Sequence, residues 1–193
     1  MLRLRHAELQ SQIVADTARL AQVEARLQII EKEGAMPADD VQIKRIPAVR
    51  VAELTGTAAS FEPESISPVI QPPYIELCGR LDRAGLIPTG PAIAYYEDRP
   101  DSDGVLVHAS LPVSAESNQE HDFLIVDLPT IEQAATIVHR GSMDDVMPTI
   151  QMLARWIDAN GYRSAGHSRE LYIECCEDRN AWVTELQEPV VTS

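Results

Sequence analysis

Apolar residues recur at alternating three- and four-residue intervals through the first 33 residues, a stretch without Gly or Pro. The seam positions hold Leu2, His6, Leu9, Ile13, Asp16, Leu20, Val23, Leu27 and Ile30. This heptad pattern predicts a coiled-coil helix, because a narrow apolar seam is buried only against a second helix. A helix of about 30 residues is about 45 Å long, so we favour pairing in a homodimer over an amphipathic helix lying on its own domain. Gly34 is expected to end this dimerisation helix, and residues 34–40 to form a linker.

The pattern changes at Val41, where a second domain is predicted to begin and to extend over residues 41–193. An internal repeat runs through this domain, and each copy is predicted to form a strand, a helix and two further strands. The copies align at matching residues, among them Gly85 with Gly161 and Tyr96 with Tyr172. We therefore predict an α+β fold in which two βαββ units share a mainly antiparallel sheet.

Both helices of the repeat have sequence signals for their ends. In the second, Ser142 is a suitable N-cap and Gly161 a suitable stop. An apolar stripe lies between them, formed by Val146, Ile150, Leu153 and Ile157. In the first, Pro72 and Pro73 are predicted to confine the main helical part to about Tyr74–Ala84, because proline cannot donate a helical hydrogen bond.

Charge changes the picture of possible partners. The chain has a net charge of -14, and residues 51–193 hold 8 Lys and Arg against 23 Asp and Glu. Such a domain repels phosphate backbones, which argues against direct nucleic-acid binding. As the alternative without any specific function, most of this charge lies on a solvated surface that aids solubility.

The three cysteines narrow the compartment and the cofactors. Cys78, Cys175 and Cys176 form no CxxC pair and have no His at metal-ligand spacing. A disulfide framework and a metal site are therefore not expected, and a reducing cytoplasm is. No apolar run approaches the roughly 20 residues of a membrane span, and no cofactor motif is found.

Four segments carry a resemblance to a known family. In chain order they are RIPAVRV, GLIPTGPAIAYYED, RELYIEC and WVTELQEPV, spread between Val41 and Val190. Their order within a duplicated βαββ unit resembles the GyrI-like domain, also met as the effector-binding domain of BmrR-like regulators. The leading segment resembles the dimerisation helix of MerR-type transcription regulators. The resemblance implies a central ligand cleft between the two copies with an acidic residue near its middle, and DNA contact only through a winged-helix head that this chain lacks.

Strand alternation suggests the residues of the site. Side chains two apart in a strand share a face, and we predict one polar sheet surface, facing away from the helices, with Trp182 at its rim. Its predicted members are Tyr96, His108, Glu170, Tyr172 and Glu185. Aromatic rings and carboxylates together suit a cationic, apolar ligand. The resemblance makes Glu170 and Glu185 the candidates for the central acid. As alternatives, Tyr96 and Tyr172 are structural, or His108 is an ordinary buried histidine.

Three functions remain open at this point. The first is a sensor of lipophilic or cationic drug-like molecules within a MerR-type regulator. The second, implied by the resemblance, is a hydrolase of reactive cyclopropane-type compounds, in which Glu185 acts with Tyr172 or Tyr96 as an acid/base pair. The third is a protein-binding module like the gyrase inhibitors. The heptad helix favours the sensor, because a lone hydrolase or gyrase-binding domain has no need of it.

Overall fold

The computed structural model describes residues 41–99, 104–115 and 121–192, all within a unit that begins at Pro37. The predicted coiled coil and linker lie outside these residues. The first copy comprises β1 (Gln42–Ile46), β2 (Val49–Ala58), α2 (Pro63–Ala84), β3 (Ala92–Asp98) and β4 (Val105–Pro112). The second comprises β5 (Leu124–Leu128), β6 (Ile131–Arg140), η1 (Met143–Asp145), α3 (Met147–Ala159), β7 (Tyr162–Ser164), β8 (Arg169–Glu174), η2 (Arg179–Ala181) and β9 (Val183–Thr192). The first copy has the predicted order of strand, helix, strand, strand, and the second has it with one additional short strand, β7, after α3. In both copies the first strand is divided in two.

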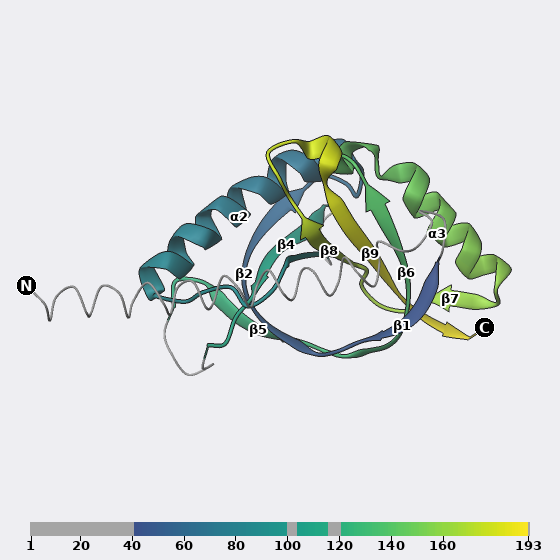
Figure 1. Cartoon of the computed structure of the whole chain (residues 1–193), viewed down its shortest axis with the longest axis horizontal. Helices are drawn as coiled ribbons and strands as arrows, with labels where there is room; N and C mark the ends of the chain where they lie inside the picture. The colour runs from purple at the N-terminus through teal and green to yellow at the C-terminus, as the bar shows by residue number, and fades with distance from the viewer. Residues whose placement is uncertain (1–40, 100–103, 116–120, 193) are drawn as a thin grey trace, which may run out of the picture. The chain divides into compact units, whose positions relative to one another are not determined.

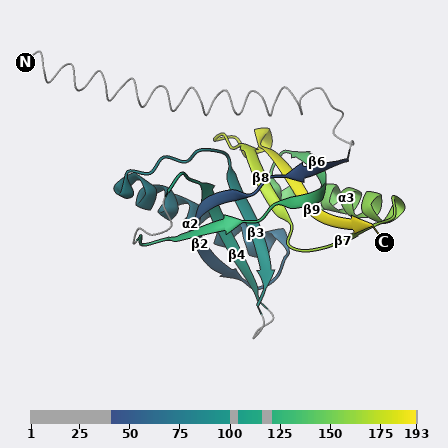
Figure 2. The same ribbon diagram turned by 90° about the horizontal axis from the view of Figure 1, so that it is seen from below.

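The described strands form one curled antiparallel sheet. Its order is β1-β6-β9-β8-β3-β4-β2-β5, and β7 pairs with β9 beside this path. The chain runs directly from β1 into β2 and from β5 into β6, and these two long segments pair along both halves. Ile46 lies opposite Ile131 and Val49 opposite Leu128. Figure 2 shows the two segments running side by side, so the edges of the curl are tied to each other.

The two faces of the sheet have different surroundings. Helices α2 and α3 cover one of them, which we call the helix face (Figure 1). Leu77 and Leu81 of α2 are buried there on β2 and β4, and Leu153 of α3 packs with Leu186 of β9. The opposite face lies inside the curl and is called the inner face. Its apolar core is formed by Val51, Ile93, Tyr95 and Leu128.

Helix α2 is twice as long as predicted. It runs over all of Pro63–Ala84 rather than Tyr74–Ala84, and Pro68, Pro72 and Pro73 lie inside it. A helix-interior proline costs about 3 kcal/mol, whereas each large apolar side chain that becomes buried contributes about 1.5–3 kcal/mol. Ile70, Leu77 and Leu81 are buried along this helix, and their packing on the sheet offsets the local cost. Gly85, with φ 69°, ends the helix as expected.

The second helical region consists of two parts where one was predicted. Ser142 does act as an N-cap, but it caps the single turn η1, and α3 begins only at Met147. Leu153 and Ile157 are buried, whereas Ile150 remains 38% exposed and lines a cavity. Neither α2 nor any other helix in the described ranges is long and apolar enough to cross a membrane.

Candidate functional site

A glutamate held by two tyrosines lies at the centre of the helix face. Tyr96 Oη and Tyr172 Oη each donate a hydrogen bond of 2.7 Å to the same atom, Glu170 Oε2. Strand pairing brings them together, because Ala94 of β3 lies opposite Glu170 and Ala92 opposite Tyr172. The small side chains of these two alanines leave space above β3 for the rings.

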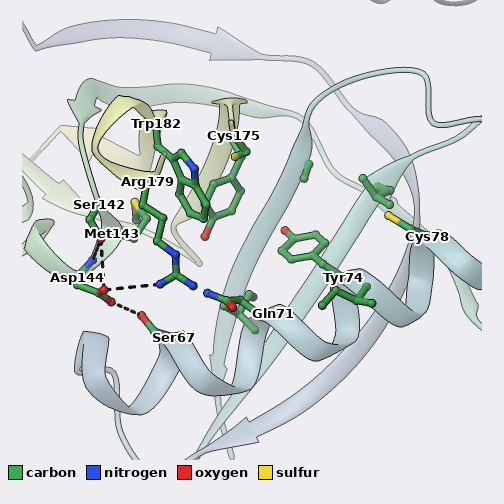
Figure 3. Close-up of a pocket in the computed structure, with 15 residues that line it drawn as sticks. Ser67, Gln71, Tyr74, Cys78, Ser142, Met143, Asp144, Cys175, Arg179 and Trp182 are labelled. Carbon is green, nitrogen blue, oxygen red and sulfur yellow. Dashed lines mark hydrogen bonds and ion pairs between the residues drawn. The ribbon is translucent and has the colours of Figure 1, made fainter. Parts of the chain in front are cut away.

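Further aromatic rings surround this carboxylate. The ring of Tyr74, from α2, meets Tyr172 edge-on at 6.1 Å between centroids, and the ring of Trp182 meets Tyr172 edge-on at 6.2 Å. Trp182 is held in place by a 2.8 Å hydrogen bond from its indole nitrogen to the Cys176 carbonyl. We call this group of Tyr74, Tyr96, Glu170, Tyr172 and Trp182 the aromatic cleft; Figure 3 shows Tyr74 and Trp182 on opposite walls.

Two adjoining cavities lie in the cleft, between α2 and the η1–α3 region. One has a volume of about 380 Å³ and is lined by Tyr74 and Trp182. The other has a volume of about 300 Å³ and is lined by Tyr96 and Glu170. Both are lined by Ser67, Ile70, Met143 and Tyr172. Together they have the size and the largely apolar lining of a small-molecule site. Glu170 lies at its base, and two further carboxylates, Asp144 and Glu62, line it as well.

Polar contacts tie the two copies together across the rim. Ser67 Oγ of α2 donates a 2.8 Å hydrogen bond to Asp144 Oδ1 of η1. Arg179 lies 3.8 Å from Asp144 Oδ2 and 5.8 Å from the centre of the Trp182 ring. Figure 3 shows this row bridging the mouth of the cleft. The width of the mouth therefore depends on how α2 and η1 sit on the sheet.

Burial governs the protonation of the aromatic cleft. It raises the pKa of Glu170 above the ordinary value, and the hydrogen bonds from Tyr172 and Tyr96 offset only part of this rise. Burial and the nearby Glu170 carboxyl raise the pKa of Tyr96 and Tyr172 well above their usual range, so both hydroxyls stay protonated donors. Among the described residues, no Lys, Arg or His lies within ion-pair distance of Glu170. The site is thus suited to a positively charged guest, which would stabilise the ionised form of Glu170.

The structure brings four of the six predicted ligand residues together and separates the other two. Tyr96, Glu170, Tyr172 and Trp182 are all in the aromatic cleft, but this surface lies under the helices, so the prediction that it faces away from them was wrong. His108 and Glu185 lie on the inner face, because His108 pairs with Tyr95 and Glu185 with Leu171. Alternation sorts side chains within one strand, whereas the face that two strands share depends on their register.

The inner-face residues have partners of their own. His108 Nδ1 lies 3.3 Å from Glu53 Oε1, and its ring stacks on Tyr95 at 4.0 Å. Glu185 forms an ion pair with Lys44. The interpretation of His108 as an ordinary buried histidine therefore fits best. Glu185 points to the face opposite both Tyr172 and Tyr96, so the structure does not bring together the acid/base pair expected for a hydrolase.

Sequence reasoning missed the contribution of α2 to the cleft. Tyr74 and Ile70 line it from the helix. The predicted helix began only at Tyr74, so Ile70 was left outside it, and Tyr74 was not singled out as a site residue. The available signal was the spacing of Ile70, Tyr74 and Leu77, which places all three near one helix face. Met143, just after the Ser142 cap, completes the floor from the second copy.

Metal and disulfide chemistry have no visible basis in this part of the chain. In the ranges that the structure describes, no group of three or more His, Cys, Asp or Glu side chains could hold a metal ion. Among the described residues, Cys78, Cys175 and Cys176 form no disulfide. Burial raises the pKa of Cys78, which keeps it in the less reactive protonated form.

Comparison with known proteins identifies the family. Residues 39–191 match the GyrI-like small molecule binding domain, and the chain belongs to this family. A comparison with curated proteins gave no match.

Solved structures agree with this assignment. EcmrR in its DNA complex is 25% identical with a TM-score of 0.66, over 100% of this chain and 72% of that one. The crystallised EcmrR C-terminal domain, from a MerR-family protein, is 24% identical with a TM-score of 0.64, over 80% and 98%. SAV2435 bound to tetraphenylphosphonium is 10% identical with a TM-score of 0.58, over 79% and 94%, which shows the shared fold alone.

Proposed function

We propose that this chain is the ligand-sensing part of a MerR-type transcription regulator and that it binds lipophilic cations in the aromatic cleft. The observation that carries the proposal is Glu170, a carboxylate without a cationic partner among the described residues, held between Tyr96 and Tyr172. Aromatic faces attract cations, and a carboxylate in a partly dry site supplies the opposite charge. A neutral ligand would leave the negative charge of Glu170 without a counter-charge.

The similar structures support both halves of the proposal. The EcmrR match, to a MerR-family protein bound to DNA, links this fold to transcription regulation. SAV2435, which shares this fold, was solved bound to tetraphenylphosphonium, and this bulky cation supports our choice of ligand class. In our proposal the heptad helix joins two copies and passes the ligand signal to a DNA-binding head, since the acidic domain itself is unsuited to DNA.

A fluorescence titration with tetraphenylphosphonium tests the proposal. Trp182 lines the cleft, whereas Trp156 stacks on Tyr162 beside the α3 core. The variant Trp156→Phe therefore leaves one tryptophan, inside the site, as the reporter. We expect saturable quenching, because the cation sits against the Trp182 ring.

The matched variant Trp182→Phe gives the control. Its remaining Trp156 should show no saturable change on the same titration. Unchanged fluorescence of Trp156→Phe, together with an unchanged melting temperature at saturating cation, would place the ligand site elsewhere or exclude this ligand class.

A further inference from the structure

The inner face of the curled sheet is polar to an unusual degree. Its buried polar side chains are Glu53, His108, Ser110, Thr136, Arg169, Glu185 and Gln187. Most of the charged ones have partners inside the curl. Tyr95 Oη donates a 2.6 Å hydrogen bond to Glu53, and Glu185 accepts from Lys44 and, at 2.7 Å, from the Gln187 amide.

Arg169 is the exception. It is only 6% exposed, and burial lowers the pKa of its guanidinium. Nη2 donates a 2.9 Å hydrogen bond to the Pro129 carbonyl, whereas Nη1 is buried without a hydrogen-bond partner. In the described part of the chain no carboxylate lies within ion-pair distance of it. A buried guanidinium without a counter-charge is strongly destabilising unless something else satisfies it.

A large cavity borders Arg169. Its volume is about 830 Å³, and it lies between the β5–β6 connection, the turn before β8 and the end of β9. Arg169 and Tyr95 line one side, and Leu128, Ile131 and Val190 are among the apolar residues that border it. Three carboxylates, Glu97, Asp127 and Glu132, border it as well. Asp127 is paired with Arg50 and Glu132 with Arg45, which offsets their charge. None of its lining residues lines the aromatic cleft. The cavity therefore combines apolar residues with a buried cation, and two of its three carboxylates are already paired with arginines.

We propose that this inner cavity is a second ligand site, which binds a small carboxylate with an apolar body through the guanidinium of Arg169. A guanidinium can donate two parallel hydrogen bonds to a carboxylate, the geometry in which such pairs are strongest. The apolar walls suit the ligand body. Glu97, on the same wall, stands 3.8 Å from His108 Nε2, and its negative charge opposes an incoming anion.

Calorimetric titration of the full chain with benzoate tests this site. Arg169→Gln removes the charge but keeps an amide donor for the Pro129 carbonyl. We expect benzoate to bind the native chain and to bind Arg169→Gln at least about tenfold more weakly, as the loss of a charged hydrogen-bond partner predicts. Arg155→Gln, which removes an exposed arginine of α3, should leave benzoate affinity unchanged. Inorganic phosphate should bind more weakly than benzoate, because it gains nothing from apolar walls.

A second variant keeps the test decisive if Arg169→Gln fails to fold. Glu97→Gln removes the opposing charge and should tighten benzoate binding a few-fold. Absence of benzoate binding at millimolar concentration, equal affinity of native chain and Arg169→Gln, or weaker binding by Glu97→Gln would each overturn the proposal. Tighter binding of phosphate than of benzoate would overturn the ligand class. Tetraphenylphosphonium titrations of the same samples report the aromatic cleft separately, so failure of one site is distinguishable from failure of the other.

Discussion

The proposed ligand recognition depends on Glu170, and two features of its surroundings shift its pKa in opposite directions. Its two tyrosine hydroxyls favour the charged form, whereas burial favours the neutral form and prevails, since the pKa is raised. Ionising this carboxyl is costly when the cleft is empty, and a bound cation would offset that cost. This gain would contribute to the binding free energy of the cation. Binding and stability should therefore respond in opposite directions when this charge is removed.

The first prediction concerns the stability of the ligand-free protein. In the unfolded chain the Glu170 pKa returns to its ordinary value, so between that value and the raised one the folded protein binds more protons. The free energy of unfolding then falls as pH rises through the raised pKa. Glu170→Gln removes this penalty and should melt at a higher temperature than the native chain at neutral pH, with the difference vanishing below the ordinary glutamate pKa.

Melting curves across pH 3 to 8, a range spanning about the ordinary glutamate pKa and neutrality, check this. Glu174→Gln is the matched control, because Glu174 follows in the same strand and lines neither cavity of the cleft. It should leave the pH profile unaltered. A Glu170→Gln protein that melts below the native chain at neutral pH would show that the ionised carboxyl stabilises the fold.

At the scale of elements, the sequence was informative about strands and helices and uninformative about how they face one another. Alternation placed Glu170 and Tyr172 on one side of β8 correctly, because it reflects backbone geometry alone. The joint placement with Glu185 failed, since the register that sets Leu171 against it comes from long-range packing. The cleft was therefore predicted in its central residues and misplaced relative to the helices.

Helix α2 illustrates a second limit. Local rules correctly identified Gly85 as its end, but they placed its start just after Pro73. In the structure the helix begins eleven residues earlier, at Pro63, and buries Ile70. The start of a helix depends on what its first turns bury, and a single sequence does not reveal that surface. Sequence reasoning therefore missed the residues that the first half of α2 contributes to the cleft, Ser67 and Ile70.

The second prediction concerns the packing of α2 on the sheet. A Cβ added at Gly56 of β2 would lie 2.6 Å from Val69 Cγ1 of α2. Gly56→Ala should lower the free energy of unfolding by about 1–3 kcal/mol, the usual cost of overpacking, and should weaken cation binding by displacing the helix that holds Tyr74. Gly79→Ala, where nothing lies within 4 Å, is the control and should be neutral or stabilising.

Urea denaturation of a double-mutant cycle measures the effect. Val69→Ala removes the atom that the new methyl group would meet. Gly56→Ala/Val69→Ala should therefore be more stable than the sum of the two single losses predicts. Simple additivity would show that the helix accommodates the methyl group without contact.

At the scale of the whole molecule, two copies of one unit produce two unlike faces. The helix face has an acidic, aromatic cleft between the copies, whereas the inner face has a buried arginine beside a second cavity. Duplication explains the matched tyrosines Tyr96 and Tyr172, and the register of the shared sheet explains why their neighbours diverge. At the rim of the cleft the two copies meet through α2 and η1, where Ser67 donates a hydrogen bond to Asp144.

The third prediction concerns assembly, which rests on the heptad pattern. An apolar seam from Leu9 to Ile30 is stably buried only by a second helix. Deleting residues 1–33 should convert a dimer into a monomer and leave the melting of the remaining domain unchanged. Sedimentation velocity on both chains decides the matter, and a full-length monomer at micromolar concentration would contradict the prediction.

The most direct test of the central claim compares a cation with a neutral molecule of similar shape. Affinities for methyltriphenylphosphonium and triphenylphosphine oxide are measured on the native chain, Glu170→Gln and Glu174→Gln. The account predicts that Glu170→Gln loses about 1–3 kcal/mol of binding free energy for the cation and little for the neutral molecule, while Glu174→Gln matches the native chain for both. Equal losses for the two ligands, or none for either, would contradict the claim that Glu170 recognises positive charge in this cleft.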